Sequence, residues 1–283
     1  MIVVTGATGT VGSELARILS ARGATVRALS RHPAEGASLP GVEWVAADMN
    51  DPGSLANAFA GAAAVFLLSG NVDAMVRMQK NVIAAAVRAG VPRLVKLSAL
   101  GASDQSKSVI GLWHYNVERV LEQSGLAWTS LRPHAFLQNL LDQAESIRQG
   151  HIYSAANGGK VPFVDARDVS AVAAEVLLTG GWEGKSPVLT GPQALSFDDV
   201  AEVLSSVLGW RVTHIVETDD EAWARLRQNG QPPWLVSGQL ALYEYQRAGG
   251  ATAKTSDAVE RITGNPPRTV EQFVQDHRHL FVP

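Results

Sequence analysis

The chain has 283 residues, of which 46% are hydrophobic and 18% charged, so it can bury the core of one large or two modest domains and does not resemble a disordered or fibrous chain. Its 24 basic and 27 acidic residues give a formal net charge of −3, which does not favour nucleic acid as a partner, and the absence of cysteine excludes disulfides, thiolate zinc sites and cysteine nucleophiles. No basic leader precedes Ile2, and no apolar run approaches the ~20 residues that span a bilayer, so we expect a soluble cytoplasmic protein that does not contact a membrane.

Over the first hundred residues, short apolar runs alternate with longer segments of helical period. Five strands are predicted at residues 2–5, 25–29, 43–46, 63–68 and 94–98. The segments between them predict crossover helices at residues 11–22, 54–60 and 74–89. This alternation is typical of βαβ units, so we expect a right-handed, doubly wound parallel sheet, the Rossmann fold.

Beyond residue 100 the alternation loosens. We expect helices at residues 110–123, 138–148 and 168–178, strands at 128–132, 187–189 and 211–216, and then a tail of short helices. Ser196 and Asp199 have the spacing of a capping box, which predicts a helix start. Because no long polar linker is visible, we expect a first domain built on this sheet over residues 1–150, to which segments near 160–190 return, and a smaller α/β C-terminal lobe over residues 151–283.

A glycine-rich loop joins the first predicted strand to the first predicted helix. Its glycines follow a G-x-x-G-x-x-G spacing. Such a turn lets the backbone approach a pyrophosphate, and the free amides at the helix N-terminus attract the anion. The sequence therefore predicts a dinucleotide site whose contacts include Gly6, Thr8, Gly9, Thr10, Val11 and Gly12.

The end of the second predicted strand favours NADP(H) over NAD(H). Proteins that bind NAD usually place an acid there for the ribose diol, whereas this chain has Ser30 and Arg31 and no acid before Glu35. A guanidinium can pair with the 2′-phosphate of NADP, although Arg31 could also be a solvated surface residue.

The ends of the third and fourth predicted strands supply further candidates for cofactor binding. After the third strand, Asp48 either hydrogen-bonds the adenine or caps the helix expected near residue 54, and Met49 lies beside it. Leu67, Ser69 and Gly70 are expected to form the floor beneath the pyrophosphate and nicotinamide, or else to belong to the core.

Four segments resemble the atypical short-chain dehydrogenase/reductases of the NmrA-like family, and within it the NADPH-dependent quinone oxidoreductases and triphenylmethane reductases. They are V-T-G-A-T-G at residues 4–9, G-L-A-W-T-S-L-R-P at 125–133, F-V-D-A-R-D-V at 163–169 and K-T-S-D at 254–257. The resemblance implies a Rossmann core with a small substrate lobe and a cleft between them. It also implies that Pro133, His134 and Phe136 flank the nicotinamide and that Ser98 lies near the reacting group.

The chain departs from the wider superfamily on the helix after the fifth strand. Active members usually carry Tyr-x-x-x-Lys there, and the corresponding positions are Ile110 and His114. Ile110 cannot donate a proton, which argues against ketone and alcohol interconversion by that mechanism. Tyr115 and Arg119 keep the spacing one position later, but one position rotates a side chain by about 100° around the helix.

A nicotinamide can still reduce an acceptor that needs no well-placed acid, such as a quinone, a cationic dye or an extended aromatic system. We therefore expect an NADPH-dependent reductase of a small quinone or aromatic acceptor, with His114 and Ser98 as candidate catalytic residues. His114 could protonate a quinone oxygen or bond the ribose, or it could be a packed helix residue. The alternatives are a redox-sensing regulator that binds NADP(H) without catalysis and a tailoring enzyme for a polycyclic aromatic metabolite.

Three residues are candidates for substrate contact, namely His134, Phe163 and Trp234, with core packing as the alternative for the aromatic ones. No histidine cluster suggests a metal site, and no G-x-S-x-G motif suggests an α/β-hydrolase. The sequence leaves the oligomeric state open.

Overall fold

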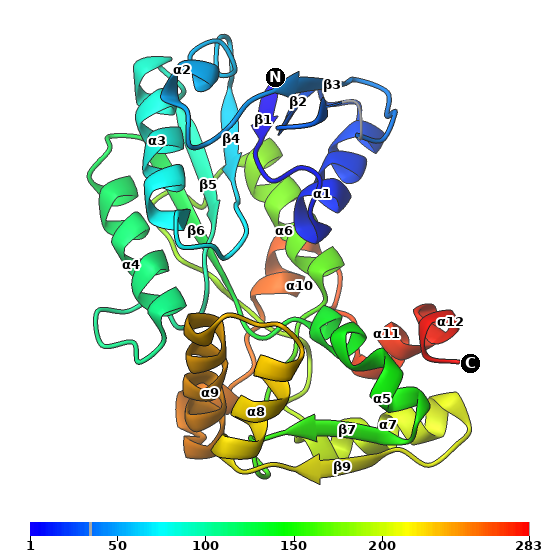
Figure 1. The fold of residues 1–283 in the computed structure, drawn as a ribbon. Helices are drawn as coiled ribbons and strands as arrows, with labels where there is room; N and C mark the ends of the chain where they lie inside the picture. Colours follow the sequence, from blue (N-terminus) through cyan, green and yellow to red (C-terminus); the bar gives the residue numbers. More distant parts are fainter. Residues whose placement is uncertain (34–35, 283) are drawn as a thin grey trace. The chain divides into compact units, whose positions relative to one another are not determined.

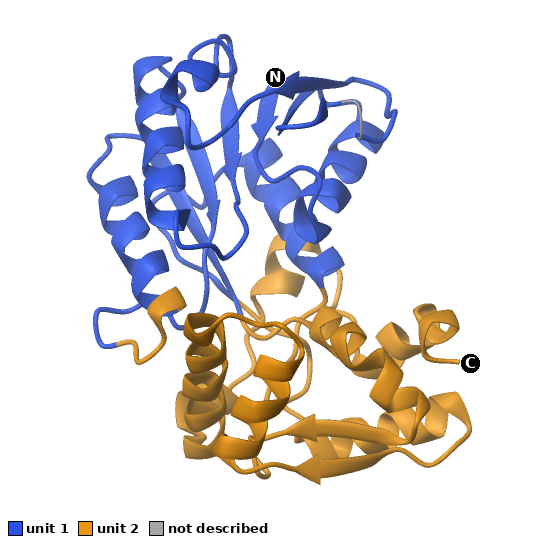
Figure 2. Cartoon of the chain, in the orientation of Figure 1, with its two compact units in different colours: residues 1–105, 111–133, 166–188 blue, residues 106–110, 134–165, 189–283 orange. Residues whose placement is uncertain are grey.

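The structure is a computed structural model that describes residues 1–33 and 36–282 (Figure 1). The chain divides into two compact units, shown in blue and orange in Figure 2. The first contains residues 1–105, 111–133 and 166–188, and the second contains residues 106–110, 134–165 and 189–283.

The first unit is built on a seven-stranded sheet with the order β3-β2-β1-β4-β5-β6-β8. Its strands are β1 (Ile2–Val4), β2 (Val26–Ser30), β3 (Val42–Ala46), β4 (Ala64–Leu67), β5 (Arg93–Leu97), β6 (Ala127–Pro133) and β8 (Val188–Leu189). β1 to β6 pair in parallel, and the strand order reverses between β1 and β4. This topology confirms the predicted doubly wound sheet, in which ligands bind at the carboxyl ends of the strands.

Helices cover both faces of this sheet. One face carries α2 (Pro52–Leu55), α3 (Met75–Arg88) and α4 (Val109–Glu122), whose apolar side chains form one core cluster with β1, β4 and β5. The other helices of the unit, α1 (Thr10–Ala21) and α6 (Ala166–Thr179), pack against each other, and α6 also packs against β4, β5 and β6. The hydroxyl of Ser170 on α6 donates to the carbonyl of Val11 on α1 at 3.0 Å.

The second unit has its own sheet and core. β7 (His151–Ser154) pairs in parallel with β9 (Thr213–Val216). The helices of this unit are α5 (Ala144–Arg148), α7 (Phe197–Leu208), α8 (Asp219–Gln228), α9 (Pro233–Ala248), α10 (Ala258–Thr263), α11 (Val270–Asp276) and α12 (Arg278–Phe281), with the 3₁₀ helices η2 (Leu137–Gln143) and η3 (Gly250–Ala253). A separate cluster of buried side chains from β7, α7 and α11 forms the core.

Most predicted elements are present, and the exceptions have local causes. The helix expected at 54–60 is the short α2, which begins earlier because Asp51 caps it and Pro52 occupies its first turn. The helix expected at 138–148 is split into η2 and α5, and the tail contains the 16-residue α9 rather than short helices alone. The capping box of Ser196 and Asp199 at the start of α7 is confirmed.

Candidate active site

The glycine loop after β1 is too tight for side chains at two of its positions. Gly6 has a φ of +61°, and a Cβ there would lie 2.9 Å from the Leu68 carbonyl oxygen. A Cβ on Gly12 would lie 2.2 Å from the Gly6 carbonyl oxygen. At Gly9 the nearest atom would be at an ordinary 3.4 Å. The loop therefore brings bare backbone to the sheet edge, as a pyrophosphate site requires.

The N-terminus of α1 opens from this loop without a side-chain cap. Its N-cap is Gly9, which supplies no side-chain hydrogen bond, and the first-turn amides of a helix have no intrahelical acceptor. Thr8 and Thr10 are exposed, whereas Val11 and Gly12 are buried. Uncapped amides at the positive end of a 12-residue helix fit an anionic ligand, so this part of the chain fits the pyrophosphate of a dinucleotide.

The end of β2 presents a cation. Arg31 is exposed, and no hydrogen bond or ion pair joins it to another described residue. The Ser30 hydroxyl accepts a hydrogen bond from the His32 amide at 3.0 Å. Glu35, the first acid after β2, lies outside the described residues. Among the described residues at the end of β2, a ribose would therefore meet the guanidinium of Arg31 and no carboxylate.

Asp48 is engaged in a local turn after β3. Its Oδ1 accepts from the Asn50 amide at 2.8 Å. The alternative role as a helix cap is wrong for Asp48, because the N-cap of α2 is Asp51, whose side chain accepts from the Gly53 amide at 2.9 Å. The neighbouring Met49 is buried in the core cluster of the first unit.

At the end of β4 the predicted floor residues have different environments. Leu67 is fully buried in the core. The Ser69 hydroxyl accepts from Nε2 of Gln79 on α3 at 2.9 Å, while Gly70 is exposed. Among these three, the side chain of Leu67 therefore belongs to the sheet core, and Ser69 and Gly70 follow the strand end.

A polar layer lies between the sheet and α4. Lys96 is on β5, and Ser98 directly follows the strand's last residue, two positions on, where its side chain points to the same side; Ser130 of β6 lies opposite Lys96 in register. Both serines are buried, and neither Oγ has a hydrogen-bond partner among the described residues. From α4, His114 and Glu118 complete the layer with 7% and 0% of their surface exposed.

Lys96 is one of three residues of this layer, with Ser130 and Glu118, that the sequence analysis missed. It is fully buried, its Nζ donates to the Leu97 carbonyl at 3.0 Å, and the same Nζ lies 2.7 Å from Nδ1 of His114. Glu118 is held by Arg132 of β6 in a two-pronged pair with distances of 2.5 and 3.1 Å. The carboxylate of Glu118 is thus largely neutralised by its own partner.

Burial perturbs both members of the Lys96–His114 pair. Desolvation lowers the pKa of Lys96 from its usual 10.5 to about 7, with Glu118 raising it and Arg132 lowering it. Desolvation, followed by the charge of Lys96, holds the pKa of His114 well below its ordinary value. His114 is therefore neutral near pH 7, while Lys96 changes its charge there.

The tyrosine nearest to His114 in sequence faces another way. Tyr115 is half-buried, and the guanidinium of Arg119 lies 5.4 Å from the centre of its ring. The inner face of α4 is instead occupied by His114 and Glu118, one turn apart. Ile110 belongs to the part of α4 that falls in the second unit.

The candidate substrate residues all lie in the second unit. His134 is buried, with its Nδ1 accepting from the Ala135 amide at 2.7 Å and its Nε2 lying 2.9 Å from the Thr252 carbonyl. Burial lowers the pKa of His134 to about 4, against the raising effect of the Thr252 bond. A polar contact with substrate through this ring would have to break one of these bonds.

The aromatic candidates differ in burial. Phe163 is buried in the core of the second unit, edge-on to Phe197 at 5.6 Å between ring centres. Phe136 and Trp234 are half-buried. Pro133 ends β6 in the first unit, where its carbonyl accepts from the Leu100 amide at 3.0 Å. Phe163 thus packs as core, whereas Phe136 and Trp234 keep some exposed surface.

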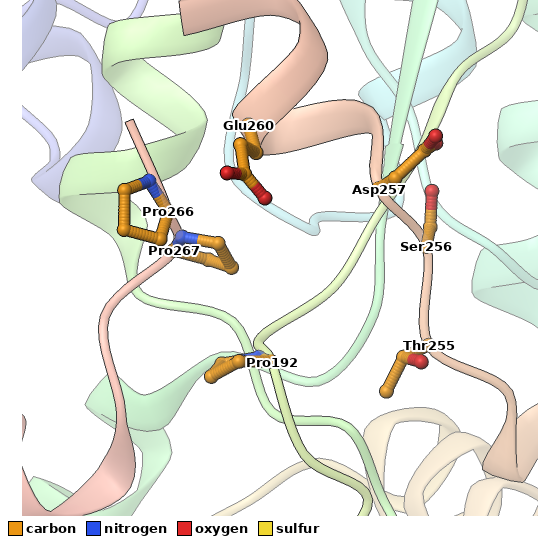
Figure 3. Close-up of a pocket in the computed structure, with 7 residues that line it drawn as sticks. All are labelled: Pro192, Thr255, Ser256, Asp257, Glu260, Pro266 and Pro267. Carbon is orange, nitrogen blue, oxygen red and sulfur yellow. The ribbon is translucent and has the colours of Figure 1, made fainter. Parts of the chain in front are cut away.

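The second unit also contains a hollow of about 700 Å³ (Figure 3). It is lined by Pro192, Thr255, Ser256, Asp257, Glu260, Pro266 and Pro267. Three of these residues belong to the K-T-S-D segment, and the Ser256 amide donates to the Thr190 hydroxyl at 2.8 Å. None of the predicted substrate residues lines this hollow.

A serine, a histidine and an aspartate form a hydrogen-bonded row in the second unit. Ser154 Oγ lies 2.9 Å from Nε2 of His214, whose Nδ1 lies 3.0 Å from Oδ1 of Asp198. Ser154 is completely buried, so its hydroxyl cannot meet a substrate. This row supports the pairing of β7 with β9.

Two further properties of the described residues bear on function. They contain no group of three or more side chains suited to hold a metal ion. No helix among them has both the length and the apolar character needed to cross a membrane.

Comparison with known proteins identifies the family. The model of the NmrA-like family matches residues 1–243. The chain is 36% identical to the NAD(P)H azoreductase of Xenophilus azovorans over 99% of both chains, and 36% identical to the (4-alkanoyl-5-oxo-2,5-dihydrofuran-3-yl)methyl phosphate reductase of Streptomyces griseus over 100% of both. It is similar to the crystal structure of the NADPH-dependent quinone oxidoreductase of Escherichia coli complexed with NADPH, with a TM-score of 0.87, 30% identity and coverage of 99% of this chain and 100% of that chain. These matches confirm the resemblance seen in the sequence, and the chain belongs to the NmrA-like family.

Proposed function

We propose that this chain is an NADPH-dependent reductase that transfers hydride to a quinone or another conjugated aromatic acceptor. The observation that carries the proposal is the side-chain-free cradle at Gly6 and Gly12, which opens onto the uncapped N-terminus of α1. Bound NADPH would supply the hydride. The chain's own part is to bind the pyrophosphate with backbone amides and to orient the nicotinamide at the carboxyl edge of the sheet.

The preference for NADPH rests on the end of β2. Arg31 is exposed there, and no described carboxylate is bonded to it. A guanidinium can bind a 2′-phosphate through two parallel hydrogen bonds, whereas NAD offers it only a hydroxyl. Two of the relatives are named for NAD(P)H or NADPH, which is consistent with this choice.

The proposed class of acceptor is supported by α4 and by the relatives. Ile110 stands where a catalytic tyrosine would be expected, and Tyr115 is stacked with Arg119, so the helix offers no phenol at the usual place. The relatives are named for azo compounds, quinones and an alkanoyl dihydrofuranone. In each of these acceptors, conjugation spreads the negative charge left by hydride addition, so less depends on a strong acid at one atom.

The test is oxidation of NADPH by the purified chain with a panel of acceptors. We expect turnover with quinones, azo dyes or triphenylmethane dyes, and little with a simple ketone of similar size. NADH serves as the matched control for the cofactor. Tight NADPH binding without turnover of any acceptor would refute the reductase and favour a redox-sensing regulator. Turnover confined to polycyclic aromatic substrates would favour a tailoring enzyme.

A further inference from the structure

The contact between Lys96 and His114 determines which nitrogen of the histidine carries the hydrogen. An ammonium group can only donate, and Nζ of Lys96 lies 2.7 Å from Nδ1 of His114. While Lys96 carries its charge, Nδ1 must therefore accept, and because the buried ring is neutral its one hydrogen is on Nε2. Among the described residues His114 has no other hydrogen-bond partner, so this N–H remains available as a donor.

The pair lies at the edge of the sheet where a ligand would bind. Lys96 is the penultimate residue of β5 and stands opposite Leu67, the last residue of β4. The residue after it, Leu68, contacts the glycine loop at Gly6 and accepts and donates hydrogen bonds with the Thr5 hydroxyl, both at 2.8 Å. Two strand spacings, about 10 Å, therefore separate β1 with its glycine loop from β5.

We propose that Lys96 is a positioning residue that holds His114 with its proton on Nε2 and replaces that proton after it has passed to the reduced acceptor. The inference deepens the proposed reductase function and rests on it. In this scheme Lys96 on β5 and His114 on α4 together supply the proton that a catalytic tyrosine would otherwise give.

The proton balance of this step is complete. Hydride addition brings two electrons and leaves the acceptor with one negative charge on oxygen or nitrogen. His114 gives its Nε2 proton to that atom and takes one from Lys96 at Nδ1, so the ring stays neutral throughout. Lys96 becomes neutral and the ring is left as the Nδ1–H tautomer. Both return to their starting forms when Nε2 takes a proton from water and Nδ1 passes its proton back to Lys96, which a lysine with a pKa of about 7 can accept near neutral pH.

The charges that face Lys96 leave this cycle possible. From α4 it faces His114 and Glu118, and from β6 it faces Arg132. Glu118 favours the ammonium form and Arg132 opposes it. Because these two groups are paired with each other, neither fixes the charge of Lys96.

The first test needs no turnover. In the long-range proton–nitrogen NMR spectrum of the histidine rings at about pH 6, where most of Lys96 is charged, we expect His114 of the wild type as the Nε2–H tautomer, assigned with His114→Gln. Lys96→Met keeps most of the length of the side chain and removes the donor. In this variant both tautomers should appear, and the ring should protonate at higher pH. A wild-type ring protonated on Nδ1, or an unchanged spectrum in the variant, would overturn the inference.

The second test is the pH dependence of acceptor reduction. The wild-type kcat should be high below about pH 7 and fall as the pH rises through that value, because Lys96 then has no proton to give. In Lys96→Met we expect kcat to be about 10²-fold lower and independent of pH in this range, with the KM for NADPH unchanged. Lys185→Met is the matched control, since Lys185 lies over Trp182 in the same unit and should retain the wild-type profile.

The outcomes separate the two proposals. If the wild type turns over an acceptor and Lys96→Met keeps the same kcat and pH profile, the inference fails and the reductase function stands. If the wild type turns over no acceptor, the reductase function fails together with the proton resupply, even where the spectrum shows the Nε2 tautomer. If Lys96→Met does not fold, the wild-type spectrum and Lys96→Gln decide the question.

Discussion

Replacing Lys96 by methionine should stabilise the protein at neutral pH, although it removes two hydrogen bonds. The lysine is fully buried in the layer between β5 and α4, and its desolvation opposes the charged form. Methionine fills nearly the same volume without a charge. Replacing buried ionised groups by apolar ones of similar size is often stabilising for this reason.

The magnitude follows from the pKa of Lys96. A pKa lowered from 10.5 to about 7 corresponds to about 5 kcal/mol of destabilisation when the folded protein carries the charge, and to about 4 kcal/mol at pH 7, where it carries half of it. Losing the bonds to Leu97 and His114 costs about 1 kcal/mol each. We therefore expect Lys96→Met to raise the free energy of unfolding by about 2 kcal/mol at pH 7.

The pH dependence gives a sharper test than the size of the effect. Between the folded pKa of about 7 and the unfolded 10.5, the unfolded chain binds more protons than the folded one, so the stability of the wild type rises with pH. The advantage of Lys96→Met should accordingly shrink by about 3 kcal/mol between about pH 6 and about pH 9. Urea unfolding of both proteins across this range measures the difference, and two parallel stability curves would refute the reasoning.

Three further predictions test other parts of the site. Arg31→Ala should weaken NADP binding about 10- to 100-fold and NAD binding much less, by fluorescence titration with both cofactors; equal losses would refute a role at the 2′-phosphate. Gly12→Ala should abolish dinucleotide binding, because its methyl group would meet the Gly6 carbonyl at 2.2 Å. The control Gly9→Ala should fold normally in thermal unfolding. Equal binding and equal thermal unfolding of the two variants would contradict the tight loop. Glu118→Gln should lower the free energy of unfolding by about 3 kcal/mol, since it leaves a partly buried arginine without its carboxylate, and a loss below 1 kcal/mol in urea unfolding would show that the pair contributes little.

The parts of the fold that depend on local pattern could be predicted from the sequence. The glycine spacing, the strand before it and the helix after it identify the loop, because strand, turn and helix N-terminus each have a residue signature. The capping box at Ser196 is equally local. By contrast, β7 lies in a segment rich in small residues and pairs with β9 some sixty positions later, so no local pattern marks it.

The candidate site was less predictable, because its key contact joins separate elements. His114 was identified from its position on the helix, but its partner Lys96 lies 18 residues earlier, on a strand. One signal was present, since a single lysine interrupts the apolar run of a central parallel strand, where both faces are buried. The bond between His134 and the Thr252 carbonyl, 118 residues apart, had no such signal.

The hydrogen bond from the Ser170 hydroxyl to the Val11 carbonyl affects when the glycine loop can fold during synthesis. The glycine loop and α1 are synthesised first. Ser170 on α6, which holds α1 through this bond, follows 159 positions after Val11. Of the second unit, residues 106–110 and 134–165 have by then been synthesised. We therefore expect nascent chains that end before α6 to lack a stable glycine loop, so that the capacity to bind a dinucleotide appears late in translation.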